Sequence, residues 1–241
     1  MSVYPILLHT VACGWYAFFW NEFLSISKED TEEWHPRYQD IHELGCRYLT
    51  NWNLFMQTLY FSGCLLHDLM KIFKGPNWLK LGTKFQILLS GSFSSLILPT
   101  GIFVSVTFWT MYGIDREIVY PKLIDDVIPY WQNHGMHTVI LPFVFAEVMT
   151  TKHRFLPVKV LATILISFEL LYGIVFLETY VEKGRWVYPL FGMLSLPVSI
   201  AVMIFLLFLL TVCLFVGIFI QNQLWGEEEK KGYKKPVKKS K

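Results

Sequence analysis

The strongest candidates for catalysis or metal binding in this chain are two histidines three residues apart, His134 and His137. They enter a segment that otherwise resembles membrane-buried helix, where an ionisable side chain is a functional candidate by default. Residues three apart share one face of a helix. The pair could bind a metal ion, form structural hydrogen bonds with a neighbouring helix, or supply a general base for a hydroxyl nucleophile such as Thr50.

The rest of the sequence limits these three chemistries without choosing among them. A di-metal lipid oxygenase needs several histidine clusters, and the remaining histidines are scattered: His9, His35, His42, His67 and His153. The chain also lacks the G-x-S-x-G motif of the common serine hydrolases. Four cysteines without paired spacing argue against a disulfide framework.

Composition indicates the elements that must position these residues. Only 17% of the residues are charged and 54% are hydrophobic, and several apolar runs are about 20 residues long, enough to cross a bilayer. We expect an all-α polytopic membrane protein, with a six-helix transmembrane domain at 1–222 and a basic, disordered tail at 223–241. The expected spans are roughly 3–20, 48–70, 85–112, 128–148, 158–177 and 194–220, and we expect Pro99 and Pro142 to bend the third and fourth spans.

Charge and polarity predict how the spans are arranged. Basic residues favour one side by about two to one, which predicts cytoplasmic termini. In the second span, one arc of about 60° carries Thr50, Asn53, Gln57, Cys64 and Asp68, so this face must turn toward other helices or a water-filled cleft. Asn53 and Gln57 could simply join helices, whereas Thr50 lies at the depth of the histidine pair.

Three motifs give the chain a specific resemblance. They are D-R-x-x-x-Y-P-K-x-x-D-x-x-I-P-x-W-x-N-H-x-M-H-T at 115–138, R-Y-L-T-N-W-N-L-F-M-Q around Thr50, and W-V-Y-P at 186–189. Together they resemble the signature of the androgen-induced protein family, and the lysine-rich tail is more similar to that of the family's androgen-dependent member. The resemblance implies a six-pass membrane hydrolase that cleaves fatty acid esters of hydroxy fatty acids.

The same resemblance implies the roles of individual residues. By motif, Thr50 is the nucleophile, His137 is the general base and His134 is a supporting residue. Asn133 or Asn53 could then hydrogen-bond the oxyanion. The substrate-cleft candidates are Gln57, Trp131, Trp186 and Tyr188. No metal or other cofactor is expected, the expected partners are a double-chain acyl ester and the membrane, and no nucleic acid is expected.

Two other functions stay open on these residues. One is a non-enzymatic membrane regulator that controls a coagulation inhibitor, as the androgen-dependent member of the family implies. The other is a metal-dependent lipid enzyme that uses His134 and His137. The family resemblance implies the plasma membrane, whereas Lys238 and Lys239 fit a signal for return to the endoplasmic reticulum.

Overall fold

The computed structural model describes residues 3–26, 43–74 and 79–233, and throughout this part of the chain the regular structure is helical. The all-α class is therefore as expected. The α-helices are α1 (Tyr4–Ile26), α3 (Leu49–Lys74), α4 (Leu79–Ser92), α5 (Leu98–Ile114), α6 (Tyr130–His137), α7 (Ile140–Thr150), α8 (Val158–Lys183), α9 (Pro189–Gly192) and α10 (Leu196–Tyr233).

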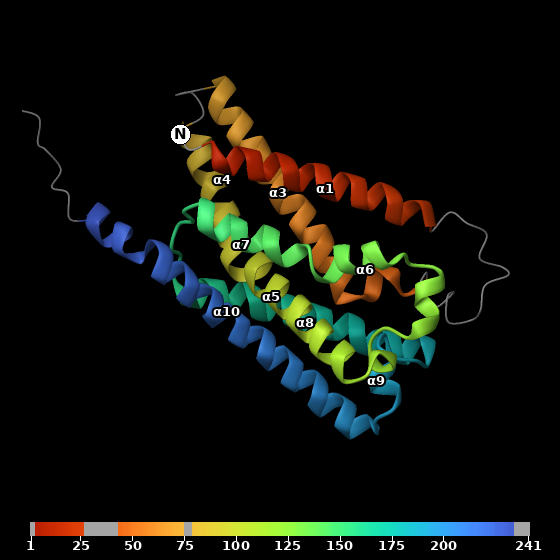
Figure 1. The fold of residues 1–241 in the computed structure, drawn as a ribbon. Coiled ribbons are helices and arrows are strands. Elements are labelled where there is room, and N and C mark those ends of the chain that lie inside the picture. Colours follow the sequence, from red (N-terminus) through yellow and green to blue (C-terminus); the bar gives the residue numbers. More distant parts are fainter. Residues whose placement is uncertain (1–2, 27–42, 75–78, 234–241) are drawn as a thin grey trace, which may run out of the picture.

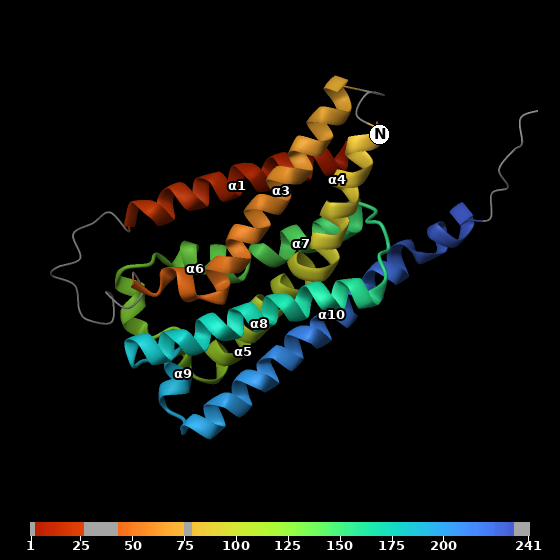
Figure 2. The same ribbon diagram turned by 180° about the vertical axis from the view of Figure 1, so that it is seen from behind.

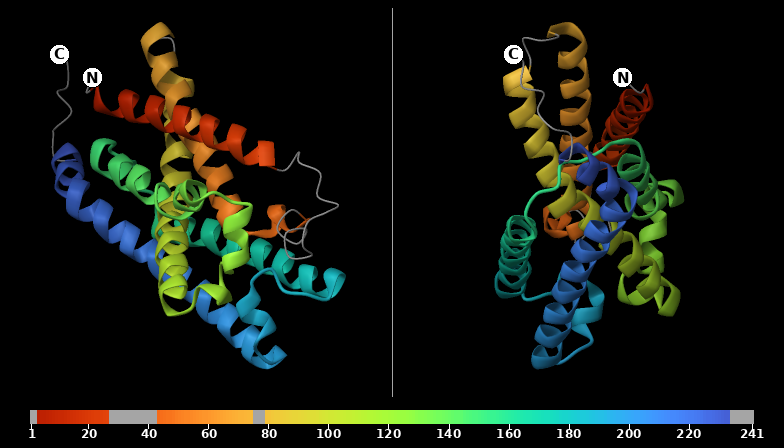
Figure 3. Two further views of the ribbon diagram at one scale, coloured as in Figure 1. Left: turned by 45° about the vertical axis from the view of Figure 1, so that its right-hand side comes forward. Right: turned by 90° about the vertical axis from the view of Figure 1, so that its left-hand side faces the viewer.

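The long helices form one bundle and run alternately between its two ends (Figures 1 and 2). We call one end the terminal end, because α1 begins and α10 ends there. The other is the loop end, which carries α9 and the short 3₁₀ helices η1 (Gly45–Arg47), η4 (Arg116–Ile118) and η5 (Lys122–Asp126). At the terminal end, the last turns of α3 and the first turns of α4 project beyond the other helices (Figure 3).

Three segments of the described residues are long and apolar enough to cross a membrane. They are Leu81–Ile114, Val158–Lys183 and Leu196–Gly226, and they indicate an integral membrane protein. With 23 and 26 residues, α1 and α3 are also long enough, but they are less apolar. Helix α3 is less apolar because it carries a polar face, and this face lies inside the bundle.

The two prolines disturb their helices in different ways. A π-helical segment, Phe93–Ile97, joins α4 to α5 immediately before Pro99. Proline lacks an N–H and its ring clashes with the carbonyl four residues earlier, so the preceding turn widens. Pro142 has a stronger effect than the expected bend: the helix stops at His137 and restarts at Ile140. The expected fourth span is therefore two helices, α6 and α7.

The C-terminal boundary differs from the expected one. Helix α10 continues to Tyr233, so residues 223–233 are helical rather than disordered. This segment is rich in glutamate and lysine, which favour helix, and the next proline is Pro236. Lys238 and Lys239 lie outside the described residues, as does most of the acidic loop after the first span.

The polar face of α3 holds neighbouring helices together. Asn53 and Gln57 are fully buried, and the Gln57 amide donates to Asn53 Oδ1 over 3.2 Å. Tyr16 of α1 donates to Gln57 Oε1 (2.6 Å), and Thr100 of α5 donates to Asn53 Oδ1 (3.0 Å). These bonds satisfy most of the buried amide atoms and fix the rotation of α3, which directs Thr50 toward α6.

Candidate active site

Thr50 and His137 meet near the loop end of the bundle. Thr50 is the second residue of α3, His137 is the last residue of α6, and Thr50 Oγ1 lies 3.3 Å from His137 Nε2. The imidazole is buried and stacks face to face on Phe108 of α5, with ring centroids 3.4 Å apart and an interplanar angle of 5°. The two side chains are therefore close enough to share a proton, although the contact is long for an O–H···N hydrogen bond.

Asn133 determines which nitrogen of His137 faces the threonine. The Nδ1–H of His137 donates to Asn133 Oδ1 over 2.8 Å, one helical turn earlier on α6. With the proton on Nδ1, Nε2 presents its lone pair to the Thr50 hydroxyl. A hydroxyl, an imidazole and an orienting amide thus lie in series, an arrangement of the kind that activates hydroxyl and thiol nucleophiles in enzymes.

The helix break that follows His137 helps to fix the position of this residue. Because Pro142 has no N–H, the Thr138 carbonyl loses its helical partner and instead accepts from Leu141 N. The His137 carbonyl is left outside the helical pattern and accepts from Ser105 Oγ of α5 over 2.7 Å. Gly135 lets α6 approach α1, since a Cβ there would lie 2.6 Å from Phe19 Cε2.

His134 does not take the supporting role expected from the sequence. Its Nδ1 is hydrogen-bonded to Thr138 Oγ1 (2.9 Å), and its ring packs on Trp109, 5.0 Å between centroids. Asn133, rather than His134, orients His137. Both nitrogens of His137 are also engaged, by Thr50 and Asn133, so the two histidines do not converge as a pair of metal ligands.

Two cavities meet at Thr50. The larger has a volume of about 730 Å³ and is lined by His137, Trp186 and residues of the loop end. The smaller, about 100 Å³, lies between α3, α5, α8 and α10 and has almost wholly apolar walls. Thr50 and Tyr188 line both cavities, so Thr50 borders both a large cavity with mixed polar and apolar walls and a small apolar one.

Tyr188 has a phenol hydrogen that can be given to a bound molecule. Its hydroxyl oxygen accepts from the Leu49 backbone N–H (3.2 Å), and its contact with the Tyr172 hydroxyl is long, at 3.4 Å. Desolvation raises the pKa of Tyr188 above its ordinary value, so the phenol keeps its proton. A protonated hydroxyl beside Thr50 is suited to stabilise an oxyanion.

The other residues expected at the site are spread more widely. Asn53 Nδ2 is buried without a hydrogen-bond partner, but Asn53 lines neither cavity. Asn133 accepts from His137 Nδ1 on the side of the imidazole away from Thr50, so its side-chain amide is not placed to donate to an oxyanion at Thr50. Gln57 is buried between helices, and Trp131 is 38% exposed and stacks on Phe18 outside the cavities.

Sequence reasoning missed the partners that fix the imidazole. The sequence did not indicate Phe108 and Ser105 of α5, because nothing in their spacing predicts contact with His137, about 30 residues later. The orienting role of Asn133 could have been found, since residues four apart on a helix are neighbours. Tyr172 was also missed, and it lines the smaller cavity beside Tyr188.

The fold and this geometry define the class of protein first. It is an all-helical membrane protein in which a threonine hydroxyl faces an oriented imidazole at the junction of two cavities. The chain belongs to the family described as FAR-17a/AIG1-like protein, which matches residues 4–222 and confirms the resemblance seen in the sequence.

Named relatives cover most of the chain. The androgen-dependent TFPI-regulating protein of Rattus norvegicus is 35% identical over 231 residues, 95% of this chain and 96% of the relative. The human protein of that name is 38% identical over 192 residues, 79% and 80% of the two chains. The human androgen-induced gene 1 protein is 31% identical over 193 residues, 76% and 81% of the two chains. No solved structure gives a significant match.

Proposed function

We propose that this chain is an integral-membrane hydrolase that cleaves fatty acid esters of hydroxy fatty acids, with Thr50 as nucleophile and His137 as general base. The observation that carries the proposal is the 3.3 Å approach of Thr50 Oγ1 to His137 Nε2, with Asn133 holding the other nitrogen. Catalytic hydrogen bonds are commonly long before substrate binds, so this distance fits a resting site. The activity implied by the family resemblance agrees with this chemistry.

Acylation is the first step. His137 Nε2 takes the proton of Thr50 as Oγ1 attacks the ester carbonyl carbon, and the carbonyl oxygen becomes an oxyanion that receives the Tyr188 phenol hydrogen bond. The intermediate then collapses by breaking the bond to the alkoxy oxygen. The imidazolium returns its proton to that oxygen, which leaves as the hydroxyl of the hydroxy fatty acid, and the fatty acyl group remains on Thr50.

Deacylation repeats the sequence with water as nucleophile. Water enters from the larger cavity, whose walls include both His137 and polar groups of the loop end. His137 Nε2 takes a proton from this water as its oxygen attacks the acyl-threonine carbonyl. Collapse breaks the bond to Thr50 Oγ1, His137 returns the proton to that oxygen, and the free fatty acid departs.

The cavities suit an ester with two long chains. The smaller cavity is lined by apolar side chains of α5, α8 and α10 and suits the part of the acyl hydrocarbon nearest the ester. The larger cavity accommodates the bulkier hydroxy fatty acid and admits water. Such a lipid partitions into the bilayer, so a site inside a membrane bundle matches where the substrate resides.

The proposed topology has six passes with cytoplasmic termini. The start of α1 and the end of α10 lie at the same end of the bundle, which requires an even number of crossings (Figure 1). Basic residues gather at this terminal end, including Lys71 and Lys74 in the last turn of α3. The positive-inside rule then puts the terminal end in the cytoplasm and Thr50 in the opposite leaflet.

Purified variants test the proposal. We expect Thr50→Ala to lower kcat/KM by about 10³-fold or more, because a nucleophile and its base act as a unit. We expect His137→Ala and Asn133→Ala to lower it by about 10²-fold or more, since general bases contribute on the order of 10²–10⁴. A fluorophosphonate probe should label the wild type and Thr50→Ser, but not Thr50→Ala.

Controls make the outcome specific. Thr163→Ala removes a hydroxyl that bonds only its own helix, to the Lys159 carbonyl, and should leave turnover unchanged. Gln132→Ala is the matched control for Asn133, because Gln132 is its buried neighbour on α6. Ordinary turnover in folded Thr50→Ala protein would overturn the proposed mechanism.

A regulatory function is the second candidate, and it rests on the printed name of several relatives, which describes them as TFPI-regulating. The Thr50→Ala variant, expressed in cells, distinguishes regulation by contact from regulation through ester hydrolysis. A regulator that acts by contact should still change the level of the coagulation inhibitor when Thr50 is lost. A regulator that acts through ester hydrolysis should not.

A further inference from the structure

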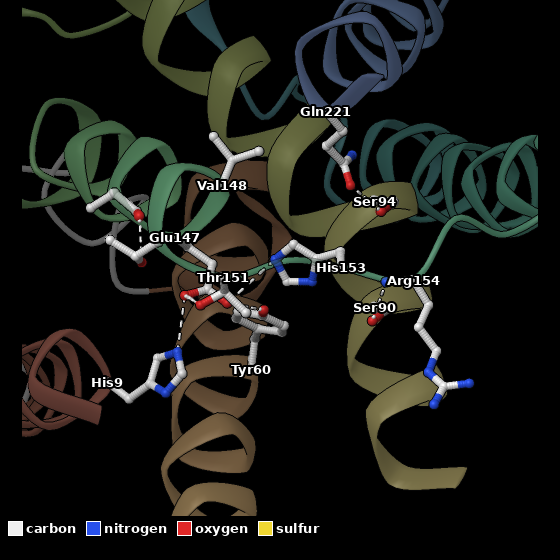
Figure 4. Close-up of polar contacts among 12 residues, drawn as sticks. His9, Tyr60, Ser90, Ser94, Glu147, Val148, Thr151, His153, Arg154 and Gln221 are labelled. Atoms are coloured by element: carbon white, nitrogen blue, oxygen red, sulfur yellow. Dashed lines mark hydrogen bonds and ion pairs between the residues drawn. The ribbon is translucent and has the colours of Figure 1, made fainter. Parts of the chain in front are cut away.

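A second buried polar cluster surrounds Glu147 at the terminal end of the bundle (Figure 4). Glu147 is fully buried on α7, and the cluster draws residues from α1, α3 and the segment after α7. On α3, the cluster residue Cys64 is 14 positions beyond Thr50, about 21 Å along a helix. The proposed ester hydrolysis uses none of these residues, so the cluster needs a separate explanation.

Four side chains converge on the Glu147 carboxylate. His9 Nε2 lies 2.9 Å from Oε2 and Tyr60 donates to Oε1 over 2.7 Å. Thr151 donates to Oε2 over 3.1 Å, and His153 Nε2 lies 3.4 Å from Oε1. Figure 4 shows the two imidazoles approaching the carboxylate from different elements. Histidines that look scattered in the sequence therefore flank one buried acid.

His9 has the arrangement of an oriented metal ligand. Its Nδ1 is hydrogen-bonded to Asp68 Oδ2 over 2.7 Å, which leaves Nε2 pointing at Glu147. A carboxylate on the second nitrogen is the usual support for a metal-binding imidazole. Cys64 completes a trio, because one donor atom each of His9, Cys64 and Glu147 lies within 4.8 Å of the other two.

His153 lies beside this trio rather than within it, with Nε2 3.4 Å from Glu147 Oε1. It is 4% exposed, and although its Nε2 lies near Glu147 it makes no hydrogen bond there. The ring is fixed by stacking on Phe93, with centroids 4.0 Å apart and planes 12° from parallel. The next residue, Arg154, donates its backbone N–H to Ser90 Oγ over 3.0 Å. Aromatic stacking and a backbone anchor thus keep His153 Nε2 facing the acid, from where a short movement toward the trio would make it a fourth ligand.

We propose that this cluster is a structural zinc site with His9, Cys64, Glu147 and His153 as ligands. Two imidazoles, a thiolate and a carboxylate are a donor set for zinc, whereas calcium and magnesium prefer oxygen ligands. The four residues are each 4% exposed or less, so no open position for substrate remains, which is the mark of a structural site. Asp68, Tyr60 and Thr151 support the ligands.

Charge balance fits a divalent cation. Glu147 and Asp68 place two carboxylates in a region with little water, and unpaired buried charge is costly. A Zn²⁺ ion compensates the Glu147 carboxylate and the Cys64 thiolate while the imidazoles stay neutral, and Asp68 keeps its charge on the hydrogen bond from His9 Nδ1–H. Binding releases the Cys64 thiol proton and any proton on His9 Nε2. The ion would fasten α1 and the segment before α8 to α3 and α7.

Metal analysis of the full-length protein in detergent tests the site. We expect about one zinc ion per chain after purification without added metal. His9→Ala and Glu147→Gln should lower the bound zinc at least about tenfold, as should the milder Cys64→Ser and His153→Gln. Replacement by cobalt should give the thiolate charge-transfer absorption of a tetrahedral site, and Cys64→Ser should abolish that band.

Two control variants test whether zinc loss is specific to the proposed ligands. A second measurement, on the wild type alone, does not require any variant to fold. Cys213→Ser and His134→Gln should keep the full zinc content, since Cys213 and His134 lie outside the cluster. Strong chelation of the wild type should lower Tm, and zinc but not magnesium should restore it. The proposal is overturned if zinc is absent and chelation leaves Tm unchanged, because the histidines would then be protonated ion-pair partners. Zinc lost from His137→Ala but kept in His9→Ala would also overturn it.

Discussion

Thr50 is a weak nucleophile by itself, and its neighbours determine whether it can react. A secondary hydroxyl needs a base within hydrogen-bond reach, and that base needs its lone pair on the correct nitrogen. His137 meets both conditions through the Asn133 hydrogen bond, and Phe108 keeps the imidazole in one plane. The chemistry therefore rests on three side chains within one helical turn of α6 and the first turn of α3.

Tyr188 provides a test of oxyanion stabilisation. We expect Tyr188→Phe to lower kcat by about 10²-fold with little change in KM, because removing one oxyanion donor costs on the order of 10²–10³. Tyr172→Phe is the matched control, since Tyr172 lines the same small cavity and contacts Tyr188, but its hydroxyl can donate to the Arg47 carbonyl. The measurement is steady-state turnover of the two purified variants. Equal losses in both would mean that the hydroxyl pair is only structural.

At the residue scale, the sequence predicted less of the site than of the fold. The depth of Thr50 and the family resemblance pointed to the Thr50–His137 pair, which the structure brings to 3.3 Å. The contacts of Gln57 and the Glu147 cluster could not be predicted, because they join segments up to 138 residues apart that share no periodic pattern. Such contacts depend on how helices rotate against one another.

The break between α6 and α7 is the element that places His137. A continuous helix would satisfy the Thr138 carbonyl within α6–α7 and would rotate the last turn of α6. Pro142 prevents this, and Ser105 takes over the His137 carbonyl. The interruption is therefore part of the site rather than a defect in a membrane helix, as is common for irregular helix at functional positions.

Restoring the missing N–H at this break should disable the site. We expect Pro142→Ala to let the helix run through 138–139 and to lower kcat by about 10²-fold, because a misplacement of about 1 Å can cost that much. Pro197→Ala is the control, since proline in the first turn of α10 replaces no helical hydrogen bond. Turnover and the thermal midpoint check the two variants. Full activity in Pro142→Ala would show that the break does not position His137.

The starts of helices were predicted well where apolar runs are uninterrupted, whereas α3 and α8 end at Lys74 and Lys183, beyond the expected 70 and 177. The expected second and fifth spans began within a residue of α3 and α8, because hydrophobic length alone defines them. Predicted helix ends were wrong at Pro142 and at the C-terminal end of α10, where backbone hydrogen bonding determines where a helix stops. The π segment before Pro99 was expected only as a bend, since sequence does not say how a helix absorbs a lost N–H.

At the scale of the whole molecule, the small cavity exists because four helices leave space beside Gly173 of α8. A Cβ at Gly173 would meet nothing within 4 Å, so the missing side chain contributes directly to the empty volume. The facing wall comes from α5 and α10, including Phe103 and Met203. For the proposed hydrolase, we therefore expect the packing of these helices to determine which acyl chain lengths fit.

Filling this space should shorten the acyl chains that the protein accepts. We expect Gly173→Leu to lower kcat/KM for long-chain substrates while short-chain substrates are unaffected, with roughly a fourfold loss for each methylene that no longer fits. Leucine also favours helix over glycine by about 1 kcal/mol, so folding should not suffer. A series of acyl lengths measures the effect. Gly113→Leu, at a glycine outside both cavities, should leave the series unchanged.

The Tyr60–Glu147 hydrogen bond has a mechanical consequence for the distant catalytic pair. It joins α3 to α7 ten residues beyond Thr50 and ten residues beyond His137, so a change in the angle between α3 and α7 reaches His137 through the break between α6 and α7. A change of only about 4° in that angle, acting over about 15 Å of helix, would change the separation of Thr50 and His137 by about 1 Å. The separation of Thr50 and His137 therefore depends on how firmly α3 and α7 are joined toward the terminal end of the bundle, and weakening the Tyr60–Glu147 hydrogen bond should lower turnover without changing a residue of the candidate site.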